Sequence, residues 1–162
     1  MNTRIQVEHT VTEEITGIDI VKEQIKIAFN QKLDLKQNEI YTRGHAIECR
    51  INAEDPVRML PFSGKINNFH PPGGPGIRVD SHVYTNYIVP TYYDSMIVKI
   101  ISFGKSREIA IKKMQNALDE IIIEGIKTNI PLHKAILSCK KFQLGEASIY
   151  YIKNRIKKLL DI

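Results

Sequence analysis

The chain has 162 residues, of which 43% are apolar and 25% charged, a length and balance typical of a globular protein with a core. Its apolar runs fall far short of the roughly 20 residues that span a bilayer, and no secretory signal opens it. We therefore expect a cytoplasmic protein that does not bind membranes. The net charge of +5 comes from lysines mixed with acidic residues, which does not favour a nucleic-acid partner.

The first 42 residues predict a strand and a broken helix. Residues 2–9 alternate between apolar and polar side chains, which is typical of a strand. Its polar side would carry Asn2, Arg4, Gln6 and Glu8. Residues 12–31 follow helical spacing, with a break at Gly17 and Asp19 as the expected N-cap of the second part. The polar stretch 32–43 separates this piece from the rest, so we expect domains at residues 1–42 and 43–162.

The second piece predicts short strands followed by helices. Residues 44–55 alternate, with one face formed by His45, Ile47, Cys49 and Ile51 and the other by Glu48, Arg50 and Asn52. Turns rich in proline and glycine separate further expected strands, at 64–70, 76–83 and 95–103. Helices are expected at 106–123, 130–139 and 148–160. Strands in hairpin-like succession predict an α+β fold, with a small antiparallel sheet packed with helices.

Arg4, Gln6 and Glu8 form the sharpest cluster of polar side chains. On one strand face they would be about 7 Å apart, close enough for a guanidinium, an amide and a carboxylate to converge on a small oxyacid. The carboxylate could then act as a base. The alternative is a solvated strand face on which Arg4 pairs with Glu8, and composition alone leaves both interpretations open.

Arg50 is the second candidate, in the middle of a predicted strand. An arginine at such a position is ordinarily an exposed surface residue. If its face covers a pocket, the fixed cation could stabilise a developing enolate oxygen. The histidines follow no metal-ligand or catalytic-triad spacing, and we expect both cysteines to be reduced.

Several motifs resemble the biotin carboxylase family. They are MNTRIQVEH followed by VTE near residue 1, RGHAIECRINAED at 43–55, PPGGPG at 71–76, YYDSM at 92–96 and EGIKTN at 124–129. They cover nearly the whole chain in the family's order, and long ordered motifs are far more specific than one short pattern. The stop soon after Leu160 resembles the stand-alone biotin carboxylase subunit of bacterial acetyl-CoA carboxylase.

The resemblance implies a C-terminal fragment: a remnant of an ATP-grasp domain followed by the biotin carboxylase C-terminal domain. The parent enzyme would be an ATP-dependent ligase that uses bicarbonate to carboxylate biotin on its carrier protein, the first half-reaction of acetyl-CoA carboxylase in fatty acid synthesis. By resemblance, Arg4, Gln6, Glu8 and the Val7 backbone would hold bicarbonate, Glu8 would deprotonate it, and Arg50 would steady the biotin enolate.

Cofactors and partners also follow from the resemblance. The parent would use ATP, Mg²⁺ or Mn²⁺, and biotin. Asn2 matches one metal ligand of the family, whose acidic partners would precede Met1, so we expect none of these cofactors to bind the fragment tightly and the fragment alone to be inactive. Expected partners are the biotin carboxyl carrier protein, carboxyltransferase subunits and a second copy, in a homodimer formed through Arg78.

Two positions depart from the family's pattern. Thr10 stands where the family commonly has proline, and Pro75 stands where a bulky aromatic residue often contributes to the subunit contact. The alternative to a catalytic part is a non-catalytic interaction module that binds a partner subunit or carrier protein. In such a module Arg4, Glu8 and Arg50 would be passive.

Overall fold

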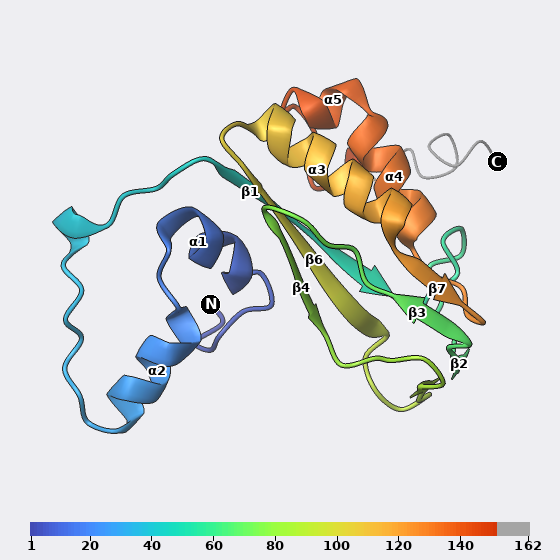
Figure 1. Cartoon of the computed structure of the whole chain (residues 1–162), viewed down its shortest axis with the longest axis horizontal. Coiled ribbons are helices and arrows are strands. Elements are labelled where there is room, and N and C mark those ends of the chain that lie inside the picture. The colour runs from blue at the N-terminus through green and yellow to red at the C-terminus, as the bar shows by residue number, and fades with distance from the viewer. Residues whose placement is uncertain (152–162) are drawn as a thin grey trace.

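The computed structural model, which describes residues 1–151, has helices packed on a small antiparallel sheet (Figure 1). The helices are α1 (His9–Thr16), α2 (Ile20–Ala28), the 3₁₀ turn η1 (Gln37–Glu39), α3 (Arg107–Glu120), α4 (Ile130–Ser138) and α5 (Lys140–Gln143). The strands are β1 (His45–Asn52), β2 (Gly64–Lys65), β3 (Asn68–His70), β4 (Ile77–Ser81), β5 (Ile88–Val89), β6 (Met96–Gly104) and β7 (Ile122–Glu124). The predicted α+β class is confirmed.

The main sheet has the order β1-β6-β4, and both pairings are antiparallel. The central strand β6 is apolar along most of its length because helices cover it on both sides: α3 on one face and the start of α1 on the other. The short strands form two further antiparallel ladders, β2-β5 and β3-β7. The strands predicted at 64–70, 76–83 and 95–103 are therefore present, the first of them split in two.

The core lies between α3 and the sheet face predicted to be apolar. Ile47, Cys49 and Ile51 of β1 are buried there. Cys49 is a free thiol, and burial raises its pKa to about 12, so that it stays protonated. Ser106 caps α3 by accepting a hydrogen bond from the Ile109 backbone N–H.

The ends of the predicted helices need correction. The helix that begins after Ser106 stops at Glu120 rather than near residue 123, because Ile122–Glu124 pair with β3 instead. These residues include two β-branched isoleucines, which suit a strand better than a helix end. The helix predicted at 148–160 lies largely outside the described residues.

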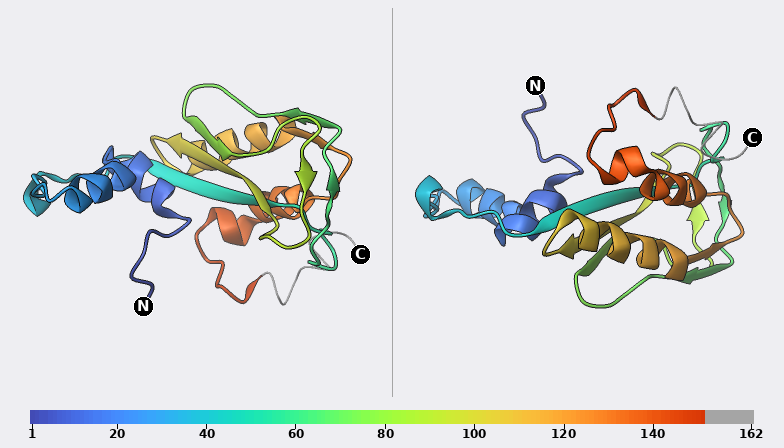
Figure 2. Two further views of the ribbon diagram at one scale, coloured as in Figure 1. Left: turned by 90° about the horizontal axis from the view of Figure 1, so that it is seen from below. Right: turned by 90° about the horizontal axis from the view of Figure 1, so that it is seen from above.

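The strand predicted at residues 2–9 is wrong. The segment is irregular and ends in a turn before α1, and its N-terminal end projects from the body in both views of Figure 2. A strand needs a neighbour to satisfy its backbone groups, and the three ladders described here all form from strands beyond residue 44. Alternation in the sequence therefore does not make a strand at this position.

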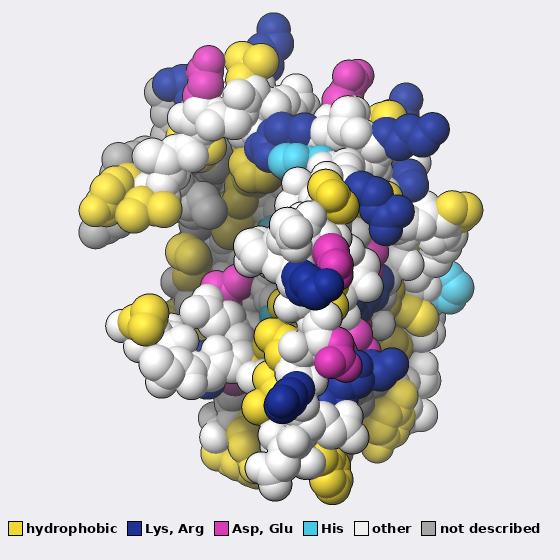
Figure 3. All heavy atoms as spheres, turned by 90° about the vertical axis from the view of Figure 1, so that its left-hand side faces the viewer, with side chains coloured by type: hydrophobic (Ala, Val, Ile, Leu, Met, Phe, Trp, Pro, Cys, Tyr) yellow, Lys and Arg dark blue, Asp and Glu magenta, His cyan; other side chains and the backbone are white. Residues whose placement is uncertain are grey.

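The predicted break in the first helical region is confirmed. Gly17 ends α1 in the left-handed region (φ 74°), where glycine is favoured, and its N–H bonds to the Glu13 carbonyl. Asp19 caps α2 by accepting from the Lys22 N–H. None of the residues of α2 is buried, and Figure 3 shows apolar side chains exposed between charged ones on the side of the molecule where α2 lies. No helix of residues 1–151 is long and apolar enough to cross a membrane.

Candidate active site

The face of the main sheet opposite α3 carries charged side chains beyond the N-terminal end of α1. Strand register places Arg50 of β1, Lys99 of β6 and Asp80 of β4 directly opposite one another. Residues opposite each other in an antiparallel ladder point to the same face. The Lys99 ammonium lies 3.3 Å from the Asp80 carboxylate, so the row consists of two neighbouring cations, Arg50 on the edge strand and Lys99, followed by one anion, Asp80.

Arg50 bonds to two carboxylates that come from distant parts of the sequence. Its Nη2 donates to Glu8 Oε2 at 2.5 Å, and its Nε donates to Glu48 Oε1 at 3.1 Å. Desolvation acts to lower the pKa of Arg50, but the hydrogen bonds and negative charges of Glu48 and Glu8 together outweigh it and raise this pKa above its ordinary value. A guanidinium held along two of its edges keeps its remaining donors free for a planar oxyanion.

Glu8 is exposed and has a pKa below its ordinary value. The cause is first a hydrogen bond from its own backbone N–H, and then the positive charges of Arg50 and Arg4, while desolvation acts in the opposite direction. A carboxylate held in the charged form is a weak base. An anion that took Arg50 away from Glu8 would raise this pKa and turn the carboxylate into a better proton acceptor.

The other residues predicted from the first segment make few contacts. Arg4 is exposed and donates to the carbonyl of Ile5, its own neighbour, at 3.0 Å. The Gln6 carbonyl accepts from the His9 backbone N–H at 3.1 Å. The Val7 carbonyl accepts from Lys99 Nζ at 3.3 Å. The sheet thus holds the segment at Val7 and Glu8, whereas Asn2 is exposed at its free end.

Asn129 supports the backbone of β1 behind Arg50. Its side-chain amide accepts from the Asn52 N–H at 2.9 Å and donates to the Arg50 carbonyl at 3.0 Å, so it pairs with the outer edge of β1 as a neighbouring strand would. Asn129 is only 8% exposed. His133 Nε2 lies 2.9 Å from the same Arg50 carbonyl, and desolvation lowers the pKa of this histidine. The Arg50 backbone is therefore fixed on the side that β6 leaves open.

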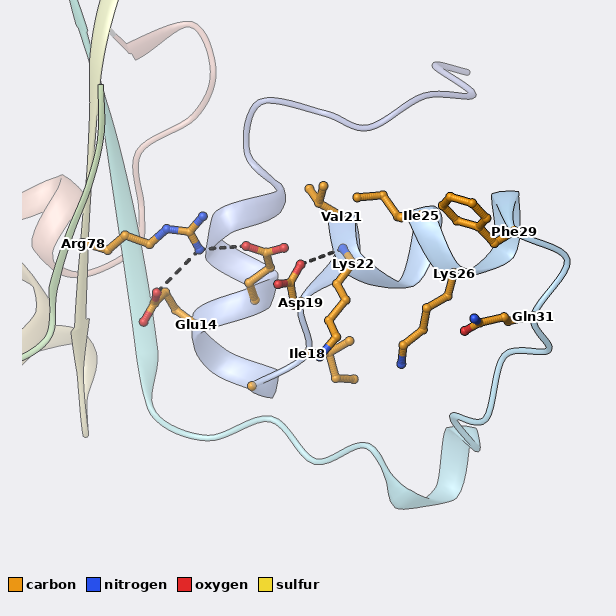
Figure 4. A pocket seen from close by; sticks show the side chains of 12 residues that line it. Glu14, Ile18, Asp19, Val21, Lys22, Ile25, Lys26, Phe29, Gln31 and Arg78 are labelled. Carbon is orange, nitrogen blue, oxygen red and sulfur yellow. Dashed lines mark hydrogen bonds and ion pairs between the residues drawn. The ribbon is translucent and has the colours of Figure 1, made fainter. Parts of the chain in front are cut away.

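Arg78 connects β4 to α1 within the chain. Its guanidinium donates to both oxygens of Asp80, at 2.9 and 3.0 Å, and to Glu13 at 2.7 Å. Arg78 lines a cavity of about 830 Å³ between α1 and α2, and Figure 4 shows the side chains around it. The residues that line this cavity do not include Arg4, Glu8 or Arg50, so the hollow is distinct from the candidate site at Arg50 and reaches the charged row only through the bonds of Arg78 to Asp80.

Sequence reasoning did not identify three residues that support the site: Glu48, Lys99 and Asn129. Glu48 shares a predicted strand face with Arg50, and this spacing of two was the available signal. Lys99 reaches the site because strand register places it opposite Arg50. Asn129 reaches it because α4, which begins after this residue, packs beside β1. A single sequence gives no signal for either contact.

Comparison with known proteins gives two family matches. The model of the biotin carboxylase C-terminal domain matches residues 48–154, and that of the carbamoyl-phosphate synthase L chain, ATP binding domain, matches residues 1–36. The chain is 59% identical to a biotin carboxylase of Haemophilus influenzae over 96% of this chain and 35% of the relative. It is 52% identical to a biotin carboxylase of Bacillus subtilis, over 94% of this chain and 34% of that relative.

Solved structures have the same fold. The biotin carboxylase subunit of a pyruvate carboxylase has a TM-score of 0.96 and 44% identity, over 99% of this chain and 36% of that one. The biotin carboxylase domain dimer of Hydrogenobacter thermophilus 2-oxoglutarate carboxylase, solved with MgADP, ADP and bicarbonate, has a TM-score of 0.94 and 45% identity, over 98% and 35%. The chain therefore spans about a third of the length of the proteins it matches.

Proposed function

The chain belongs to the biotin carboxylase family, and we propose that its residues supply the bicarbonate- and biotin-facing part of an ATP-dependent biotin carboxylase. The contact between Arg50 and Glu8 carries this proposal. It joins the first segment to the main sheet at a point where a guanidinium, a carboxylate and a second arginine are within electrostatic reach of one another. Such a group suits a small oxyanion.

The proposed roles follow from the charges at this point. Bicarbonate bound by Arg4, Gln6 and the Val7 backbone would compete with Glu8 for the guanidinium of Arg50. Once released from that ion pair, Glu8 would be the base that removes the bicarbonate proton. Arg50 would then stabilise the negative oxygen of the biotin enolate.

ATP and its metal ion would supply the phosphoryl transfer that activates bicarbonate in the whole enzyme. Residues 1–151 by themselves do not fit the metal: they contain no group of three His, Cys, Asp or Glu side chains that could hold an ion, and Asn2 is exposed. We therefore propose that these 162 residues alone do not turn over ATP, with residues 1–42 belonging to the ATP-grasp domain and 43–162 forming the C-terminal domain.

Partners are also proposed for the whole enzyme. They are the biotin carboxyl carrier protein, carboxyltransferase subunits that accept the carboxyl group, and a second copy of the enzyme. The surface around Arg78 is the proposed contact between copies, since this guanidinium remains partly exposed after its bonds to Asp80 and Glu13. A cytoplasmic location fits the buried free thiol of Cys49.

A chimera tests the proposal. We would replace the matching third of the Haemophilus influenzae biotin carboxylase with this chain and measure ATP-dependent carboxylation of free biotin. The chimera should be active. Arg50→Ala should lower kcat by about a hundredfold to a thousandfold, the usual effect of removing one preorganised group, whereas the control Arg58→Ala on an exposed loop should have little effect.

Two outcomes would contradict the proposal. One is a folded chimera with no carboxylation. The other is bicarbonate-dependent phosphate release by the 162 residues alone. An inactive chimera that still bound the carrier protein, with or without Arg50, would instead favour the non-catalytic interaction module.

A further inference from the structure

Thr10 connects α1 to the carboxylate that holds Arg50. Its hydroxyl donates a hydrogen bond to Glu48 Oε2, while Glu48 Oε1 accepts from Arg50 Nε. The Thr10 residue is 0% exposed and the Glu48 side chain only 5% exposed. The side chains of Thr10, Glu48 and Arg50 are therefore connected by consecutive hydrogen bonds. Glu8 adds one more bond at the other end of the Arg50 guanidinium.

The chemistry of a buried carboxylate makes the threonine hydroxyl important. A buried carboxylate oxygen without a partner is unfavourable, because it has lost its water and gained no donor in return. Without the Thr10 hydroxyl, Glu48 would have to turn towards water to solvate Oε2, and this rotation would take Oε1 away from Arg50. The guanidinium would then keep only its contact with the exposed Glu8.

We propose that Thr10 is a positioning residue for Arg50 and acts through Glu48. The proposal rests on the function proposed above for Arg50 and adds a residue to it. A proline at this position would fit the first turn of a helix but would have no donor. The threonine of this chain thus supplies Glu48 with a bond that proline cannot make, and Arg50 is held more firmly than it would be beside a proline.

The alternative is that the hydroxyl only satisfies a buried carboxylate and stabilises the fold. Both ideas predict a lower melting temperature without the hydroxyl, so stability does not separate them. The mobility of the Arg50 side chain does, because a purely stabilising role would leave the Arg50 Nε–H as protected from solvent as before.

The test measures exchange of the Arg50 Nε proton with water by NMR in the 162-residue chain. Thr10→Val keeps the shape and removes the hydroxyl, and should speed exchange about tenfold, the ratio expected on losing one hydrogen bond to a charged group. Thr10→Ser restores the hydroxyl and should stay within about twofold of the unaltered chain. In a Glu48→Gln background, Thr10→Val should have no further effect, because the connecting carboxylate is gone.

Exchange changed less than about threefold by Thr10→Val, or changed equally by Thr10→Ser, would overturn the proposal. If Thr10→Val does not fold, Thr10→Pro takes its place, since proline suits this turn, and the same limits apply. The result is independent of catalysis: an inactive chimera would refute the function proposed for Arg50 and leave the Nε exchange unaffected.

Discussion

The body of the protein, from β1 to α5, and the first 42 residues are built differently. In the body, β6 is covered on both faces and its central residues are almost fully buried. In the first piece, α2 buries none of its residues, and the segment before α1 has no strand partner within residues 1–151. The close packing of the first piece on the main sheet is made by α1, through Thr10 and Glu13.

Because of this difference, the residues of the proposed site are held in place to different degrees. Arg50 stands on a strand whose backbone is bonded on both sides, by β6 and by Asn129. Glu8 and Arg4 lie on an irregular segment held by a few polar contacts. The body should therefore set the position of Arg50, while the position of Glu8, the proposed base, should depend on what else contacts the first segment.

Substitutions in the core should produce the largest contrast between the two regions. Ile51→Ala removes a side chain that is 0% exposed and should lower the free energy of unfolding by about 2–5 kcal/mol. The control Ile25→Ala, on α2, removes one that is 54% exposed and should change it by less than about 0.5 kcal/mol. Urea unfolding measures both, and equal losses would mean that α2 is packed in solution.

Loss of the Asn129 side-chain amide should have the next largest effect on the free energy of unfolding. Asn129→Ala removes two side-chain bonds to β1 and should lower the free energy of unfolding by about 2 kcal/mol, at roughly 1 kcal/mol for each bond. Asn38→Ala, on the exposed 3₁₀ turn η1, is the control and should change it by less than about 0.5 kcal/mol. Hydrogen exchange should become faster at the Asn52 amide, and an unchanged rate there would contradict the proposed edge pairing.

Breaking the contact of Arg78 with Glu13, which joins the two regions, should have a smaller effect on the free energy of unfolding. Arg78→Met removes the bonds from β4 to Glu13, whose side chain is only 9% exposed beside the 33% exposed Arg78, and should lower the free energy of unfolding by about 1 kcal/mol, the upper end for surface ion pairs. Hydrogen exchange of α1 amides should become faster while that of β6 amides stays the same. Lys26→Met, which breaks a pair within α2, should leave α1 unaffected. Exchange that accelerated equally in α1 and β6 would show that the two regions unfold together.

Acidification should have the smallest effect and act on the contact of Glu8 with Arg50. The pKa of Glu8 is lowered from 4.5, so the contact is fully present above this ordinary value and is lost as pH falls through the lower pKa of the folded state. NMR signals of Arg50 Nε should therefore shift below pH 4.5, before the amide signals of β6 change. In Glu8→Gln this early step should be absent, and its persistence would assign it to another carboxylate.

The sequence predicted the body better than the first segment, for a physical reason. Alternation over residues 44–55 and the Ser106 cap reflect burial against a core that the chain itself provides, and both predictions are confirmed. The same alternation over residues 2–9 gave a wrong strand, because residues 1–151 offer it no partner strand. The contact of Glu8 with Arg50 joins residues 42 apart in sequence, and only the family resemblance, not the spacing, brought them together.

Two activities of the chimera separate the proposed role of Glu8 from that of Arg50 most directly. Glu8→Gln should abolish both bicarbonate-dependent phosphate release and biotin carboxylation, since the base acts on bicarbonate. Arg50→Gln should reduce biotin carboxylation about a hundredfold or more and phosphate release far less, since it acts on the biotin enolate. Equal loss of the two activities in Arg50→Gln, or full phosphate release in Glu8→Gln, would contradict the roles proposed for this pair.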